Sequence, residues 1–216
     1  DNDASPATFG EAMAGAGKGF RDVIMVTLGT GVGGGIVIDG KIYRGFRHAG
    51  GELGHNCMIY KGLHCTCGLD GCMEMYCSVT ALIRQTREAM QANPQSKMWE
   101  LTQGSLEKVS GRTSFDAARQ GDPVAQQVVD QYVDYLGYGI SGLINIFVPE
   151  VLIVGGGISR EGEALIRPVN DYVARHCYSR DLKPRTKICA AQLGNDAGVI
   201  GAALLGKMSG ANAYDR

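Results

Sequence analysis

The sequence has no long apolar run, no signal-peptide pattern and almost no net charge, and each absence excludes a class of protein. No segment approaches the roughly 20 apolar residues of a transmembrane helix, so no membrane partner is expected. The formal net charge is −1, which argues against a basic surface for nucleic acid. Hydrophobic residues make up 44% of the 216 residues, enough for a sizeable globular core.

A secreted disulfide framework is also excluded, because seven cysteines cannot all pair with one another. We therefore expect a cytoplasmic protein. The first residue is Asp rather than Met, so we expect the sequence to begin inside a longer chain. Thirty-two glycines, about twice the usual share, predict many tight turns or close backbone approaches.

The order of apolar runs predicts an α/β domain that begins with a β-hairpin. Three short β-type runs come first, at residues 23–28, 35–38 and 41–43. The Asp39-Gly40 pair between the last two runs is a strong hairpin signal. Later segments are expected as helices at 78–90, 113–120, 123–147, 160–176 and 197–207, and as strands at 151–154 and 186–190. This alternation implies parallel strands covered by helices, whereas residues 91–112 are polar and ambiguous.

The strongest helix signal covers residues 123–147. Asp122 is a good N-cap, Pro123 stands at the first helical position, and apolar residues recur every three or four positions. Pro149 is expected to end this helix.

The stretch "GHNCMIYKGLHCTCGLDGC" predicts a metal site. His55, Cys65, Cys67 and Cys72 form the pattern H-x9-C-x-C-x4-C. A C-x-C pair does not readily close into a disulfide, whereas three thiolates and one imidazole fill the tetrahedral shell of Zn²⁺. Because all four positions are protein ligands, the zinc is expected to be structural. Cys57 and Cys77 are interpreted instead as small buried thiols.

Two carboxylates flank this cysteine stretch. Glu52 lies shortly before His55, and Glu74 lies shortly after Cys72. Held by a rigid loop, they can accept hydrogen bonds from a polyhydroxy ligand; they are equally well explained as surface acids. The residues alone leave both interpretations open.

Two glycine-rich segments indicate a nucleotide site. "LGTGVGGG" fits G-x-G-x-x-G, but a β-type run follows where the dinucleotide fingerprint requires a helix, and "GAGKG" lacks parts of a P-loop. The first segment is therefore expected as a strand, a Gly/Thr turn and a second strand, with N–H groups and the Thr30 hydroxyl free for phosphate. The second, "IVGGGIS", lies between a strand and a helix. Either segment alone is best explained as a tight turn, but together they favour a nucleotide site.

These segments together resemble the ROK family (repressors, open reading frames and sugar kinases), especially its glucokinase-like members. The resemblance rests on "NDA" at residues 2–4, "LGTGVGGGIVIDGKIYRG", "AGGELGH", "CTCGLDGCME", "VLIVGGGIS" and "GNDAGVIGAALL", in that order. It implies the actin-like, hexokinase-like ATPase fold (ribonuclease H-like) in two lobes. Residues 1–216 would be the C-terminal lobe and 1–20 its junction with an N-terminal lobe. The family's Asp-x-Gly-Gly-Thr phosphate loop is missing from this sequence, so the isolated segment is expected to be inactive.

The resemblance also implies roles for individual residues. Asp3 would be the catalytic base, and the sugar would be bound by Asn2, Glu52, His55 and Glu74. The nucleotide would be bound by Gly29, Thr30, Gly31, Gly155, Gly156 and Gly157. ATP with Mg²⁺ would be the phosphoryl donor, and zinc would hold the sugar-binding loop.

The resemblance leaves a choice between two classes of protein. The first is an ATP-dependent hexose kinase, most closely a glucokinase, with N-acetylmannosamine, allose or fructose as competing sugars. The second is a sugar-responsive transcriptional repressor, which would bind DNA through a helix-turn-helix upstream of this sequence. A homodimer is expected from the resemblance alone.

Overall fold

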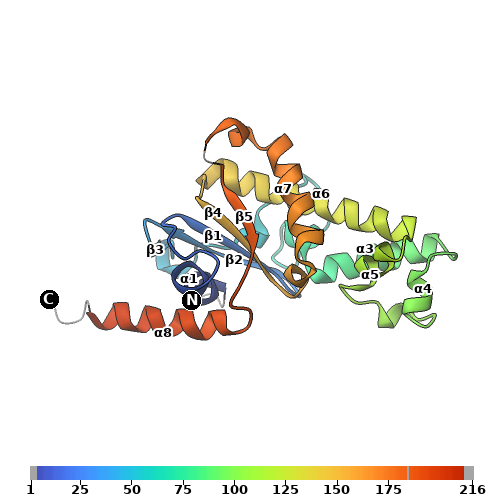
Figure 1. The fold of residues 1–216 in the computed structure, drawn as a ribbon, viewed down its shortest axis with the longest axis horizontal. Coiled ribbons are helices and arrows are strands. Elements are labelled where there is room, and N and C mark those ends of the chain that lie inside the picture. Colours follow the sequence, from blue (N-terminus) through green and yellow to red (C-terminus); the bar gives the residue numbers. More distant parts are fainter. Residues whose placement is uncertain (1–3, 184, 212–216) are drawn as a thin grey trace.

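The computed structural model describes residues 4–183 and 185–211, with side chains up to residue 207, and contains a five-stranded mixed sheet. The strands are β1 (Val23–Leu28), β2 (Val32–Ile38), β3 (Lys41–Ile42), β4 (Val151–Gly156) and β5 (Lys187–Ala190). Their order across the sheet is β3-β2-β1-β4-β5 (Figure 1). The first three strands pair antiparallel, whereas β1, β4 and β5 run parallel. The expected hairpin beginning and parallel continuation are confirmed.

Helices cover both faces of the sheet. On one face lie α1 (Ala4–Ala14) and α8 (Asp196–Ala211), which pack against each other; on the other face lie α6 (Pro123–Phe147) and α7 (Glu163–His176) (Figure 1). Strand side chains alternate between these layers. Val23 and Met25 of β1 join the core under α1, whereas Ile24 joins the core under α6. The sheet is therefore buried on both sides, as expected for parallel strands.

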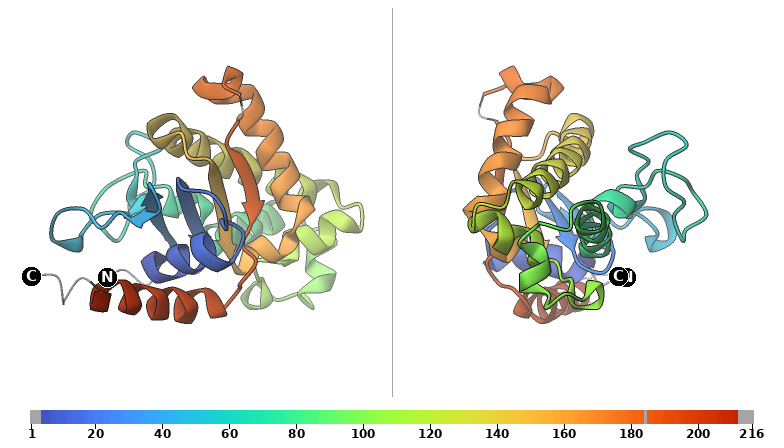
Figure 2. Two further views of the ribbon diagram at one scale, coloured as in Figure 1. Left: turned by 60° about the vertical axis from the view of Figure 1, so that its left-hand side comes forward. Right: turned by 90° about the vertical axis from the view of Figure 1, so that its right-hand side faces the viewer.

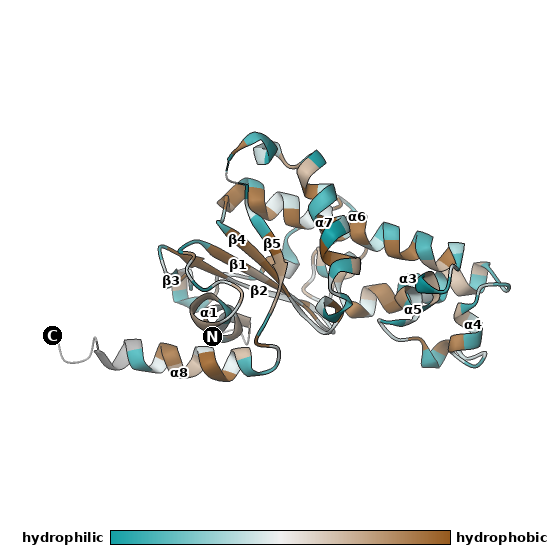
Figure 3. Cartoon of the chain, in the orientation of Figure 1, coloured by the Kyte–Doolittle hydropathy of each residue, from teal (hydrophilic) through white to brown (hydrophobic). Residues whose placement is uncertain are grey.

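A helical extension projects beyond the end of the sheet. It consists of α3 (Val79–Ala92), α4 (Met98–Leu101), α5 (Thr113–Arg119) and the first turns of α6, around a small core of its own. Met90 and Met98 are fully buried in that core. Hydrophilic and hydrophobic residues alternate along its helices (Figure 3).

The segment between β3 and α2 (Glu74–Cys77) extends away from the body of the molecule, which Figure 2 shows from the side. It contains only two 3₁₀ turns, η1 (Phe46–His48) and η2 (Leu53–His55), with two isolated β-bridges. Gly71 has φ +81° here, and a Cβ at this position would lie 1.8 Å from the Ile59 carbonyl oxygen. Glycine is therefore required where the cysteine stretch turns back on itself.

Several predicted boundaries were wrong. The second strand begins at Val32 rather than at residue 35, because the glycines after the turn pair with β1. The helix expected from Arg160 begins at Glu163, since a 3₁₀ turn, η4 (Gly157–Glu161), comes first. Helix α1 was missed: apart from Glu11, its residues are small or apolar, and it lies between the sheet and α8, so it shows little amphipathic period.

No helix in the described part of the chain is long and apolar enough to cross a membrane. Cys77 is buried as expected, but Cys57 is exposed, which corrects the interpretation of both as buried thiols. The Cys57 thiol donates to the carbonyl oxygen of Asp70, 3.4 Å away, at the surface of the extended segment.

Candidate functional site

The two glycine-rich segments meet at the carboxyl ends of neighbouring parallel strands. In the β1–β4 register, Leu28 pairs with Gly156, so each strand runs directly into its glycines. A Cβ on Gly156 would lie 2.2 Å from the Leu28 carbonyl oxygen, and this glycine has φ +84°. Ligands of open α/β sheets bind outside the carboxyl ends of the strands. The structure therefore brings Gly29–Gly31 and Gly155–Gly157 to the same edge of the sheet.

The Gly/Thr turn between β1 and β2 is held from the side by α3. The Val79 N–H donates to the Gly29 carbonyl at 2.8 Å, and the Thr80 hydroxyl donates to the Thr30 carbonyl at 2.7 Å. Thr30 itself is exposed. Within the turn, the Gly29 N–H donates to the Gly31 carbonyl at 3.0 Å. The turn therefore has a fixed orientation, in which the N–H groups of Thr30 and Gly31 and the Thr30 hydroxyl are the candidates for contact with phosphate oxygens.

The four predicted zinc ligands come together. The ligand atoms of His55, Cys65, Cys67 and Cys72 all lie within 4.8 Å of one another. Cys65 Sγ is 3.7 Å from His55 Nδ1, and Cys67 Sγ is 3.6 Å from Cys72 Sγ. Sulfurs at about 2.3 Å from a tetrahedral zinc are separated by about 3.8 Å, so the donor set and its spacing fit this metal.

The thiols of this cluster differ in their protonation. Burial raises the pKa of Cys72 to about 12, helped by hydrogen bonds with Cys67 and Cys65. By contrast, the backbone N–H of Leu69 lowers the pKa of the exposed Cys67 thiol. A buried thiolate such as that of Cys72 is costly without a positive partner, and a bound metal ion deprotonates a coordinating thiol outright.

Glu74 lies between this cluster and the Gly/Thr turn. Its Oε2 accepts a hydrogen bond from the Val32 N–H at 2.9 Å, and its Oε1 lies 3.8 Å from Cys65 Sγ. The side chain also fills the space beside Gly31, where a Cβ would lie 2.3 Å from Glu74 Oε2. The carboxylate is therefore half-buried and fixed, unlike an ordinary surface acid.

Glu52 is exposed and directly precedes η2, the turn that contains His55. That turn packs on β2: a Cβ on Gly54 would lie 2.0 Å from the Val32 carbonyl oxygen. Asn2 and Asp3 lie outside the described residues. Helix α1 begins directly after them, and Ala4 lies beside Gly33 of β2, where a Cβ on the glycine would be 3.2 Å from the alanine Cβ.

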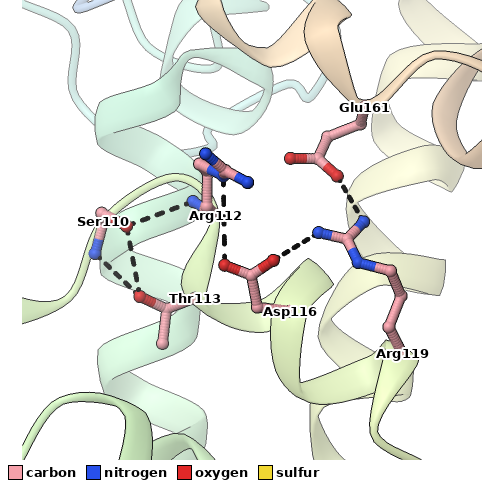
Figure 4. A network of polar contacts seen from close by, with 6 residues as sticks. All are labelled: Ser110, Arg112, Thr113, Asp116, Arg119 and Glu161. Carbon is pink, nitrogen blue, oxygen red and sulfur yellow. Dashed lines mark hydrogen bonds and ion pairs between the residues drawn. The ribbon is translucent and has the colours of Figure 1, made fainter.

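One part of the site was not predicted from the sequence. A cavity of about 710 Å³ opens beside the second glycine segment, between α5 and η4. Val79, Gly111 and Ile158 form its apolar surface. Its polar side includes Arg112, Asp116, Arg119 and Glu161, four of the six residues in the network of Figure 4. The only sequence signal was the spacing of Asp116 and Arg119 on one helix, which is common on exposed helices.

The model of the ROK family matches residues 1–209. The glucokinase of Streptomyces coelicolor is 40% identical over 96% of this chain and 66% of its own length. The crystal structure of a ROK family glucokinase from Streptomyces griseus in complex with glucose and AMPPNP matches with a TM-score of 0.88 and 41% identity, covering 95% of this chain and 66% of that one. A xylose repressor of Caldicellulosiruptor bescii is 28% identical over 93% of this chain and 50% of its own. The chain thus spans just under two thirds of the length of these glucokinases, and it has the actin-like, hexokinase-like fold.

Proposed function

The chain belongs to the ROK family, and on that premise we propose that it is part of an ATP-dependent hexose kinase, most closely a glucokinase. The observation that carries the proposal is the position of Glu74, which joins the four-ligand metal cluster to the Gly/Thr turn. One carboxylate thus links the place proposed for the sugar to the place proposed for the phosphates. The likeness to glucokinases over nearly the whole chain supports glucose as the sugar.

The nucleotide would lie along the edge formed by the two glycine segments. Thr30 and Gly31 would bind phosphate oxygens through their N–H groups and the Thr30 hydroxyl. Gly29, whose N–H donates to the Gly31 carbonyl at 3.0 Å, would allow the phosphates to approach the backbone closely. Gly155–Gly157 allow close approach of the nucleotide, and the cavity beside them would take the nucleoside. Mg²⁺ bound with ATP would offset the phosphate charge.

The sugar would be bound by Asn2, Glu52, His55 and Glu74. Asp3 would remove the proton from the attacking sugar hydroxyl as the new O–P bond forms and the bond from the γ-phosphorus to ADP breaks. His55, Cys65, Cys67 and Cys72 would hold the zinc, which fixes the geometry of the loop and leaves one imidazole nitrogen of His55 for a sugar oxygen.

We also propose that residues 1–216 form the C-terminal lobe of the kinase, with 1–20 at the junction between two lobes. Closure of the lobes would exclude water, which competes with the sugar for the phosphoryl group. On this proposal, the isolated segment is inactive, and the protein acts in the cytoplasm.

The test is sugar-dependent release of ADP from MgATP by the protein expressed from its full reading frame, across a panel of hexoses that includes N-acetylmannosamine, allose and fructose. The proposal expects turnover that requires a sugar and is fastest with glucose. Sugar binding without turnover on any of them would contradict it and favour a sugar-responsive repressor, the class of the more distant relative.

A further inference from the structure

The 3₁₀ turn η4, which follows the second glycine segment, is tied to α5 by an ion-pair network. Arg119 lies between two carboxylates (Figure 4): Nη1 donates to Glu161 Oε2 at 2.6 Å, and Nη2 donates to Asp116 Oδ1. Arg112 Nε lies 3.9 Å from the other oxygen of Asp116. The Glu161 side chain is 7% exposed, whereas that of Arg119 is 48% exposed. A carboxylate so far removed from water depends on its cationic partner, so the Arg119–Glu161 contact is the critical one.

Two glycines with left-handed φ angles bound this turn. Gly156 has φ +84°, and Gly162 has φ +58°. Within the turn, the Ser159 hydroxyl donates to the Gly156 carbonyl at 2.7 Å, and the Gly162 N–H donates to the Ser159 carbonyl at 3.0 Å. The turn is therefore a closed local unit between two backbone pivots. Its position relative to α5 depends on the contact that Glu161 makes with Arg119.

The cavity lies between the two elements that this contact joins. Gly111 and Asp116 line it from the side of α5, and Gly157 and Ile158 line it from the side of η4. The contact between Arg119 and Glu161 thus helps to fix the separation of the two walls, together with Ile158, which is buried in the main core. A ligand that contacts both walls binds best when the walls are already at the right separation, since no binding energy is then lost in ordering them.

We infer that Arg119 and Glu161 are positioning residues for the nucleoside of the phosphoryl donor, an inference that rests on the proposed kinase function. They hold the wall formed by η4 against α5 and so set the affinity for nucleotide. Neither residue is placed at the sugar or at the transferring phosphoryl group. Their loss therefore weakens nucleotide binding selectively and leaves sugar affinity unchanged.

The experiment measures dissociation constants for glucose and for AMPPNP, a non-hydrolysable ATP analogue, by calorimetry on the protein from its full reading frame. Glu161→Gln keeps the shape of the side chain and removes its charge. Its matched control is Glu88→Gln, which removes a carboxylate from an exposed ion pair with Arg84 at 3.0 Å on α3. We expect Glu161→Gln to weaken AMPPNP binding about tenfold, equivalent to ~1.4 kcal/mol, with glucose binding unchanged and no effect from the control.

Arg119→Lys is the second variant. It keeps the charge but loses the planar fork that contacts both carboxylates, so a smaller loss of AMPPNP affinity is expected. If Glu161→Gln does not fold, Arg119→Lys tests the inference in the same way, by a loss of affinity for AMPPNP but not for glucose. AMPPNP affinity equal to that of the wild type, or an equal loss of affinity for both ligands, would overturn the inference. A wild-type protein that binds glucose but no AMPPNP would overturn the kinase function itself, a distinct result.

Discussion

At the scale of single residues, Glu74 couples two parts of the site that lie far apart in the sequence. One carboxylate oxygen accepts the Val32 N–H, and the other lies beside Cys65. Glu74 thus contacts both the four-ligand cluster and the strand that follows the turn proposed for phosphate binding. The space beside Gly31 is filled by the same side chain.

Gly31→Ala should lower turnover about a hundredfold, because its Cβ would lie 2.3 Å from Glu74 Oε2 and displace the carboxylate or the turn. Steady-state kinetics with MgATP and glucose measure the effect. Gly142→Ala is the control, since a Cβ at that position meets nothing within 4 Å. Equal rates for both variants would show that the Glu74 side chain can move away from residue 31 without any effect on turnover.

Cys72→Ser should abolish zinc binding and lower the melting temperature, because a structural zinc site contributes directly to folding. Metal analysis of the purified protein should find one zinc per chain in the wild type. Cys57→Ser should retain the zinc, since Cys57 is exposed and lies outside the four-ligand cluster. A wild-type protein without zinc, or a Cys72→Ser variant that keeps it, would refute the metal site.

The clustering of the four candidate zinc ligands could be predicted from sequence because thiol and imidazole groups at this spacing have few other uses, and the structure brings the four residues together. The exposure of Cys57 could not be predicted from sequence, because the burial of a side chain in a segment without regular structure depends on how that segment folds back. The fixed position of Glu74 could not be predicted either, since the backbone N–H that it binds, that of Val32, lies 42 positions away in the chain.

At the scale of elements, α6 is the central packing helix on its face of the sheet. It packs against the sheet, α3, α5 and α7, and it carries both a strong N-cap and a close glycine contact. Asp122 accepts hydrogen bonds from the Val124 and Ala125 N–H groups, and Gly137 allows Tyr172 of α7 to approach.

Gly137→Ala should destabilise the protein by about 1–3 kcal/mol, because its Cβ would lie 2.6 Å from ring atoms of Tyr172 and push α7 away from α6. Gly142→Ala on the same helix should instead stabilise it by about 0.5–1 kcal/mol, since it relieves the cost of a mid-helix glycine. Urea denaturation gives both values. Destabilisation by both variants to the same extent would contradict the packing argument.

Asp122→Ala should destabilise the protein by about 2–3 kcal/mol at neutral pH. Burial acts to raise the pKa of Asp122, but hydrogen bonds from the Ser96 hydroxyl and from the N–H groups of Ala125, Lys97 and Val124 outweigh it and lower the pKa. The folded pKa is thus below the unfolded one. The stabilisation is complete above the unfolded pKa of about 4 and is lost as pH falls through the folded pKa.

The free-energy difference between wild type and Asp122→Ala, measured by denaturation at several pH values, should therefore shrink below about pH 4. Asp122→Asn keeps an acceptor for the helix cap but cannot titrate, so its stability should lack this component of the pH dependence. A difference between wild type and Asp122→Ala that stays constant down to pH 2 would refute the role of the charge.

Helix α6 was predicted with correct ends because the N-cap residue, Pro123 and the apolar spacing all indicate the same helix. Helix α1, by contrast, was missed. The reason is physical: α6 has one apolar face, but α1 is covered by the sheet on one side and by α8 on the other. The start of α7 was misplaced because nothing in "GGGISREG" distinguishes a 3₁₀ turn from the first turn of an α-helix.

At the scale of the whole molecule, the site is assembled from segments that only the fold brings together. The cavity proposed for the nucleoside combines the start of α3, residues 111–119 and residues 157–161, and no local sequence pattern indicates such a combination. The two glycine segments were predictable as turns, but their common edge follows from the parallel pairing of β1 with β4.

We propose that this chain carries the catalytic carboxylate, Asp3, and binding groups of a sugar kinase. The most direct test compares wild type and Asp3→Asn, both from the full reading frame, for glucose 6-phosphate formation from glucose and MgATP. We expect steady turnover by the wild type and a loss of about a hundredfold or more in the variant, with glucose affinity retained. Equal rates for the two proteins, or no product from the wild type, would contradict it.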